Sequence, residues 1–146
     1  MGGNGRQKVA GYSGKPLVAK LGIKPDTRIA ILNAPKGYDR VLGKQPPRVT
    51  RRPSIVGPLD FVQFFTNEKR ELERRFAALA RSLAPAGMLW ISWPKQASGV
   101  ATDLTEDMIR AIGLAHGLVD VKVAAVDDVW SGLKFVRRLK DRSPHR

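Results

Sequence analysis

The stretch Ser82–Val100, SLAPAGMLWISWPKQASGV, decides the fold that the rest of the chain adopts. It predicts the end of a helix, a tight turn at residues 85–87, a strand over Met88–Ser92 and a polar loop. Residues 88–91 are all apolar, without the alternation of a half-exposed strand. Such a run is typical of a central strand that helices cover on both faces.

Further strands are predicted on both sides of this one. Apolar runs over residues 28–32 and 59–65 predict two strands, and the proline-flanked residues 48–52 allow only a short edge strand. The last part of the chain, valine-rich and interrupted by a glycine-containing turn, predicts a β-hairpin over residues 119–139. Its turn is expected over Asp127–Gly132, with Ser131 and Gly132 most simply forming it.

Two long amphipathic helices are predicted between the strands. The first covers residues 68–83, with Asn67 as its cap and one apolar stripe made of Leu72, Phe76, Leu79 and Leu83. The second runs from a cap at Asp103 or Thr105 to His116. Its inward residues are predicted to be Leu104, Met108, Ile112 and Ala115. A short helix over residues 15–21 and one or two helical turns over residues 38–43 complete the expected elements.

The alternation of strands and helices predicts an α/β fold, a Rossmann-like domain of three layers. Its mostly parallel sheet is expected to have five or six strands and to end in an antiparallel β-hairpin. We assign this domain to residues 15–140. The glycine-rich residues 1–14 are predicted to form a flexible basic arm, and residues 141–146 a basic tail.

Composition excludes several classes of function. The 146 residues contain no cysteine, which excludes disulfides, thiolate metal sites and cysteine nucleophiles. No apolar run approaches the roughly 18 residues of a membrane span, and the first residues do not form a secretory signal. We therefore expect a cytoplasmic protein without a membrane partner.

The net charge of +13 is unevenly distributed. Residues 1–52 carry 12 basic and 2 acidic side chains, whereas residues 53–133 carry 8 and 10. Residues 134–146 carry 6 basic side chains and 1 acidic one. Two basic ends around a near-neutral middle favour a polyanionic partner, either nucleic-acid phosphate or an anionic small molecule. The alternative is a solvated surface whose charge serves only solubility.

Ligands of open α/β sheets bind beyond the carboxyl ends of the strands. Three loops meet there, and they supply candidate ligand- or anion-binding residues: Asn33, Lys36, Thr66, Asn67, Trp93, Lys95 and Ser98. Trp93 either stacks on a planar ligand or covers the end of the sheet. No residue set predicts a catalytic centre or a metal site, since Asp127 and Asp128 lack a third ligand and neither histidine neighbours a serine and an acid.

The order of these elements resembles a shortened class I methyltransferase. In that family a glycine-rich loop after the first strand holds S-adenosylmethionine, and an acidic residue that ends the second strand binds its ribose. Here the loop at residues 33–37 has the single glycine Gly37 and includes Pro35, which has no amide proton. Arg51 and Arg52 stand where the acid is expected.

The sequence also resembles a family of short bacterial proteins of unknown function. The shared motifs are GYSGxPL followed by KLGIK, WPKxASGVxTDLTED and VDxxWSGLKFV, which begin here at Gly11, Trp93 and Val126. The resemblance implies a bacterial cytoplasmic setting and assigns no activity. We predict a non-catalytic or vestigial methyltransferase-like binding module without a cofactor. A non-specific nucleic-acid-binding protein and a small active methyltransferase are the alternatives.

Overall fold

The structure, a computed structural model, describes residues 15–142. The predicted arm at residues 1–14 and the last four residues of the predicted tail lie outside this range. One six-stranded sheet has the order β2-β1-β3-β4-β6-β5. Its strands are β1 (Arg28–Leu32), β2 (Thr50–Arg52), β3 (Leu59–Phe65), β4 (Leu83–Pro94), β5 (Leu118–Ala125) and β6 (Trp130–Arg137). The first four strands are parallel, and β6 is antiparallel to both β4 and β5. The predicted Rossmann-like α/β fold with a terminal hairpin is confirmed.

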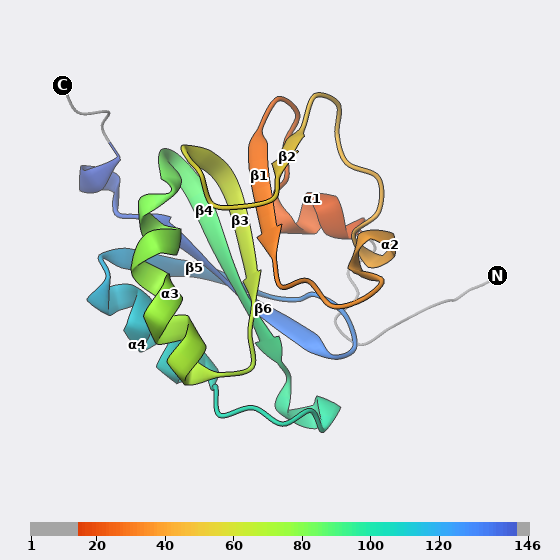
Figure 1. The fold of residues 1–146 in the computed structure, drawn as a ribbon, viewed down its shortest axis with the longest axis vertical. Helices are drawn as coiled ribbons and strands as arrows, with labels where there is room; N and C mark the ends of the chain where they lie inside the picture. Colours follow the sequence, from red (N-terminus) through yellow and green to blue (C-terminus); the bar gives the residue numbers. More distant parts are fainter. Residues whose placement is uncertain (1–14, 143–146) are drawn as a thin grey trace.

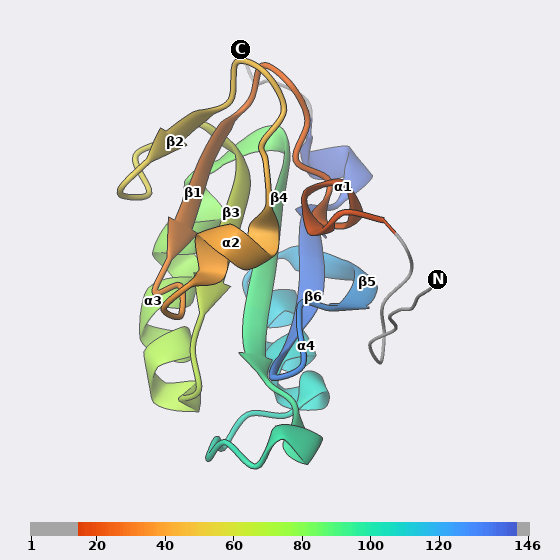
Figure 2. The same cartoon turned by 90° about the vertical axis from the view of Figure 1, so that its right-hand side faces the viewer.

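Helices cover both faces of the sheet, which gives three layers (Figure 1). One face carries α3 (Lys69–Arg81) and α4 (Glu106–Ala115). The other carries the short helices α1 (Leu17–Leu21) and α2 (Tyr38–Leu42), which lie in front of the sheet in Figure 2. Two 3₁₀ turns, Gln96–Ser98 and Leu139–Asp141, complete the elements. No helix within residues 15–142 is both long and apolar enough to cross a membrane.

Strand β4 is the central strand that its apolar run predicts. Leu89, Trp90 and Ile91 are completely buried. Leu89 and Ile91 belong to the core beneath α3 and α4, whereas Trp90 belongs to the core beneath α1 and α2. The Trp90 indole Nε1 donates to the carbonyl oxygen of Leu21 at 2.8 Å, which joins the end of α1 to the middle of the sheet. Both faces of β4 are therefore covered.

The turn predicted at residues 85–87 is wrong, because these residues lie inside β4. Leu83 pairs with Leu59 and Met88 with Phe61, so β4 uses five residues where β3 uses two. The extra residues form an irregularity in the ladder rather than a chain reversal. A Cβ on Gly87 would lie 2.6 Å from the carbonyl oxygen of Leu59, so the close approach of the two strands there requires glycine.

The hairpin turn lies within the predicted Asp127–Gly132 but is shorter than predicted. Ser131 and Gly132 lie within β6, where they pair with Trp93 and Ser92 of β4. The turn precedes them, and there Asp127 Oδ1 accepts the amides of Val129 and Trp130 at 2.9 and 2.8 Å. The sequence pattern marks the glycine correctly, but its role is packing: a Cβ on Gly132 would lie 2.9 Å from the Trp90 ring.

The helix faces agree in part with the prediction. Leu72, Phe76 and Leu79 of α3 are buried as predicted, whereas Leu83, the last residue of the predicted stripe, is buried as the first residue of β4. Thr105 caps α4 by accepting the amide of Met108. The prediction of the inward face of α4 is wrong at two positions. Met108 and Ala115 are exposed, and Ile109 and Gly113 are buried in their place. Asn67 is also not the cap of α3, because the helix starts one residue later, with Glu68 in the cap position.

Candidate functional site

The chain leaves β1 and β3 toward opposite faces of the sheet. The connection after β1 runs through α2, and the connection after β3 runs through α3 on the other face. Since β1 and β3 are neighbours, their carboxyl ends form the topological switch point, where ligands of open α/β sheets bind. This crevice is the first candidate site.

The polar groups at the switch point are bonded to one another. Asn33 follows β1 with a φ of 59°, and its Nδ2 donates to the carbonyl oxygen of Phe65 at 3.2 Å and to Glu71 Oε2 at 3.4 Å. The hydroxyl of Thr66, directly after β3, donates to Glu71 Oε1 at 2.6 Å. Glu71 of α3 therefore joins the ends of both strands, and the crevice is bridged by the chain's own side chains.

The end of β2 carries a cation. Arg51 Nη1 donates to Asp39 Oδ1 of α2 at 2.7 Å. The Nε of the neighbouring Arg52 is buried without a hydrogen-bond partner in the described part of the chain. The loop between β1 and α2 closes on itself, with the amide of Tyr38 donating to the carbonyl oxygen of Pro35 at 3.0 Å.

A buried polar chain lies beneath the switch point. The Tyr38 hydroxyl donates to Gln63 Oε1 at 2.7 Å, and Gln63 Nε2 donates to Ser92 Oγ at 3.0 Å. Burial raises the pKa of Tyr38. The Tyr38 and Trp130 rings pack edge-on against Phe65, with centroids 4.8 and 5.1 Å away. These contacts satisfy the buried polar groups and fill the space on the α2 side of β3.

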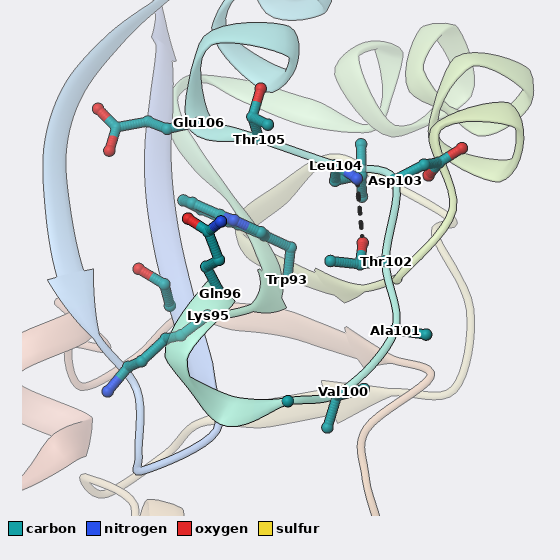
Figure 3. Close-up of a pocket in the computed structure, with 12 residues that line it drawn as sticks. Trp93, Lys95, Gln96, Val100, Ala101, Thr102, Asp103, Leu104, Thr105 and Glu106 are labelled. Atoms are coloured by element: carbon teal, nitrogen blue, oxygen red, sulfur yellow. Dashed lines mark hydrogen bonds between the residues drawn. The ribbon is translucent and has the colours of Figure 1, made fainter.

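A cavity of about 590 Å³ opens beside the switch point, between the segment after β4 and the start of α4 (Figure 3). Its lining includes Trp93, Lys95, Gln96, Thr102, Glu106 and Ser131. Figure 3 shows the Gln96 side chain directed toward Trp93, while the ammonium group of Lys95 points away from Trp93. Trp93 itself is only 6% exposed, so it forms a wall of the cavity and also covers the end of the sheet.

Several polar groups around this cavity hold the loops in place. Asp103 Oδ1 accepts the amide of Lys69 at 2.8 Å, so this carboxylate occupies the amino-terminal end of α3. The Thr102 hydroxyl donates to the carbonyl oxygen of Asn67 at 2.7 Å. Glu106 pairs with Arg110 of the same helix at 2.5 Å. Their hydrogen bonds fix the geometry of the segment that follows β4.

The structure divides the predicted site residues among these features. Asn33 and Thr66 meet at the switch point through Glu71. Trp93 and Lys95 line the cavity, and the Ser98 hydroxyl donates to the carbonyl oxygen of Lys95 at 2.7 Å. The two remaining residues lie apart: Asn67 Nδ2 donates to the carbonyl oxygen of Ala101 at 3.4 Å, and Lys36 is exposed in the loop after β1. Ligand binding by these seven residues stays a prediction.

Sequence reasoning missed the roles of Glu71, Asp103 and Gln63. An acid at a helix start is favourable whatever else it bonds, so neither Glu71 in the first turn of α3 nor Asp103 before α4 signals a distant partner. Gln63 had a local signal, since it is the one polar residue inside the apolar run FVQFF of β3. A polar residue at a fully buried position implies a hydrogen-bond partner, which here is Tyr38 on one side and Ser92 on the other.

No family model and no curated protein matches the sequence. Solved structures with a similar fold include several methyltransferases. A SAM-dependent methyltransferase from Aquifex aeolicus has a TM-score of 0.58 at 13% identity, over 82% of this chain and 86% of that one. A precorrin-6y C5,15-methyltransferase from Geobacter metallireducens has a TM-score of 0.56 at 13% identity, over 84% and 86%. The magnesium protoporphyrin IX methyltransferase of Synechocystis, solved with bound SAM, has a TM-score of 0.54 at 16% identity, over 84% and 74%. This chain therefore has the Rossmann-like fold of the class I methyltransferases.

Proposed function

We propose that this chain is a non-catalytic binding module that keeps the methyltransferase fold and does not use S-adenosylmethionine. The observation that carries the proposal is the bridge at the switch point, where Glu71 bonds both Asn33 and Thr66. A ligand entering this crevice would have to break these bonds, and the buried Thr66 hydroxyl would lose its bond to Glu71 at a cost of about 1–3 kcal/mol.

The residues around the crevice do not fit S-adenosylmethionine. The ribose of this cofactor offers two hydroxyl donors, which need an acceptor, whereas Arg51 at the end of β2 has only donors. The nearby carboxylate of Asp39 is paired with that arginine. Pro35 removes one amide from the loop that would have to approach the methionine part. We therefore derive no methyl-transfer step for this protein.

Calorimetric titration with S-adenosylmethionine and with S-adenosylhomocysteine tests this proposal. We expect no heat of binding for either compound up to about 1 mM, which corresponds to a binding free energy weaker than about −4 kcal/mol. Circular dichroism of the same sample shows that the protein is folded. A dissociation constant in the low micromolar range would contradict the proposal and favour the small active methyltransferase.

As part of the same proposal, we place the chain in the family of short bacterial cytoplasmic proteins whose motifs it resembles. Two of these motifs are joined in space, because the Lys95 amide in the second donates to the carbonyl oxygen of Val129 in the third at 2.7 Å. Ser131 of the third motif also lines the cavity beside Trp93. Fractionation of a bacterial host that produces the tagged protein should recover it with the cytoplasmic fraction.

Non-specific binding of nucleic acid is a second candidate function, favoured by the charge of the first third of the chain. Residues 15–52 carry ten basic side chains and only two acids, Asp26 and Asp39. Both acids are paired with arginines, Arg48 and Arg51, so the remaining cations of this segment have no carboxylate within it. Contacts to phosphate need only such cations and no sequence-reading element.

Titration of duplex DNA at several salt concentrations tests the second function. We expect weak binding, equal for duplexes of unrelated sequence, with log K falling by about 0.9 per phosphate neutralised for each unit of log salt. A shortened chain without residues 1–14 and 141–146 separates the basic ends from the folded domain. No measurable binding at about 50 mM salt, where phosphate contacts are strong, would exclude this function.

A further inference from the structure

Five lysines gather around the carboxyl end of α1, where β5 and β6 form the last two strands of the sheet. This lysine cluster consists of Lys20 in α1, Lys24 in the following turn, Lys95 after β4, Lys122 in β5 and Lys134 in β6. Lys122 and Lys134 are directly opposite each other in the ladder, and Lys134 is opposite Trp90 of β4. Directly opposed residues share a face, so all three lie on the face that α1 covers.

Contacts and charges show that these lysines are close to one another. Lys122 Nζ donates to the carbonyl oxygen of Lys20 at 3.4 Å, although the two residues are 102 positions apart. Burial lowers the pKa of Lys20, and the charges of Lys122 and Lys95 lower it further. The pKa of Lys134 is lowered in the same way, by burial first and then by Lys122 and Lys24.

Carboxylates on the neighbouring elements are directed elsewhere. Asp26, two residues after Lys24, pairs with Arg48. Asp120 of β5 is opposite Phe135, on the α4 face of the sheet, and pairs with Arg110 at 2.8 Å. Within residues 15–142, Lys134 has no hydrogen bond or ion pair. Within the described part of the chain, no carboxylate pairs with Lys122 or Lys134, so these two lysines carry positive charges that it does not neutralise.

The arrangement of these lysines lowers the stability of the folded protein as long as no ligand neutralises their charges. Like charges directly opposite each other in a sheet are destabilising, and partial burial increases the cost of each charge. Lys134 is half-buried beside the Trp90 ring, a position where an apolar side chain would pack without that cost. Only one of the three ammonium protons of Lys122 is used by the carbonyl of Lys20, which leaves donors for a ligand.

We infer that the lysine cluster binds a compact, multiply charged phosphate group, such as an inorganic triphosphate or the phosphate chain of a nucleotide. The inference adds a ligand class and a place to the proposed binding module, and it rests on that proposal. A compact oligophosphate brings several negative charges to the few positions where the lysines converge. A duplex spreads its charges along its axis, so a cluster of five lysines neutralises few of its phosphates and binds it weakly.

Calorimetric titration with sodium triphosphate at about 50 mM salt tests the inference, because charge contacts are little screened there. The test variant is Lys122→Gln with Lys134→Gln. The matched control is Lys44→Gln with Lys140→Gln, which removes the same charge from two exposed positions away from the cluster. We expect the test variant to weaken triphosphate binding at least about tenfold, since each charged hydrogen bond contributes about 1.5–3 kcal/mol. The control should stay within about twofold of wild type, because exposed charges contribute little.

Three results would overturn the inference. The first is no triphosphate binding to the wild-type protein, and the second is equal weakening in the test and control variants, which indicates a general effect of net charge. The third is duplex DNA binding that depends on Lys122 and Lys134 while triphosphate does not bind. Thermal unfolding of both variants provides the control for folding. The titration with S-adenosylmethionine is a separate measurement, so failure of this inference and failure of the proposed function are distinguishable.

Discussion

Gly113 is the residue at which α4 comes closest to the sheet. Glycine inside a helix costs about 1 kcal/mol relative to alanine, so helix propensity alone predicts that Gly113→Ala stabilises the protein. The added Cβ would lie 2.1 Å from Cε1 of Phe135, a completely buried ring that packs edge-on against Phe76 at 5.7 Å. Overpacking of this kind costs about 1–3 kcal/mol, and we expect it to outweigh the propensity gain. Urea denaturation of Gly113→Ala should therefore show a lower free energy of unfolding.

A shorter side chain at position 135, which faces Gly113, provides the control. In the presence of Phe135→Leu, the substitution Gly113→Ala should cost less than it does alone, because the ring that it meets is gone. Additive effects of the two changes would show that Gly113 and Phe135 are not coupled. Ala111→Gly, on the exposed face of the same helix, should cost about 1 kcal/mol from propensity alone.

At the scale of the element, the start of α3 depends on Asp103, which lies in the cavity lining before α4. Asp103 Oδ1 accepts the amide of Lys69, the first residue of α3, at 2.8 Å. A carboxylate at this end bonds an amide that has no partner within the helix and interacts favourably with the helix dipole. We expect Asp103→Ala to lower the free energy of unfolding by about 0.5–2 kcal/mol, the cost of losing a cap. Urea denaturation measures this loss.

The control for Asp103 is Asp128→Ala, which removes the same charge from an exposed position in the hairpin turn. It should change the free energy of unfolding by less than about 0.5 kcal/mol. Amide exchange of the first turn of α3 should accelerate in Asp103→Ala and stay unchanged in Asp128→Ala. Equal effects of the two substitutions would show that Asp103 acts through charge alone and not as a cap.

At the scale of the whole molecule, stability depends on the pH in two opposite ways. Lys20 and Lys134 have a lowered pKa when folded, so between that pKa and the ordinary value of about 10.4 the unfolded chain binds more protons. Stability therefore rises with pH in that window. The pKa of Tyr38 is raised, so above about pH 10 the unfolded chain loses a proton that the folded one keeps, and stability falls. Urea midpoints should rise in the window between the lowered lysine pKa and about pH 10, and then fall above about pH 10.

Two variants separate these contributions. Lys134→Met should raise the midpoint at neutral pH and flatten the rise, because the buried charge and its repulsion from Lys122 are removed. Tyr38→Phe should remove the fall at high pH, together with some stability at every pH, since Gln63 loses its partner. A midpoint that falls steadily from neutral pH upward in the wild-type protein would contradict this account.

The sequence by itself was sufficient for the fold class and for the main strands and helices. The apolar runs of β1, β3 and β4 and the stripe Leu72–Phe76–Leu79 of α3 are local patterns, read within one segment. Alternation of strand and helix then leaves few topologies, because crossovers are right-handed and both faces of a parallel sheet must be covered. Two of the errors fall at Pro85–Gly87 and at Ser131–Gly132, where glycine marks close packing between strands instead of a turn.

Only the tertiary structure decided what the sites are made of. Glu71 meets Asn33 across 38 positions, Lys69 meets Asp103 across 34, and Lys122 meets Lys20 across 102. No local pattern carries these pairings, since a polar residue at a strand end or helix start is equally stable facing water or facing a partner. The sheet order brings these partners together from distant parts of the chain. That is why the methyltransferase-like fold was predictable and the bridged crevice and lysine cluster were not.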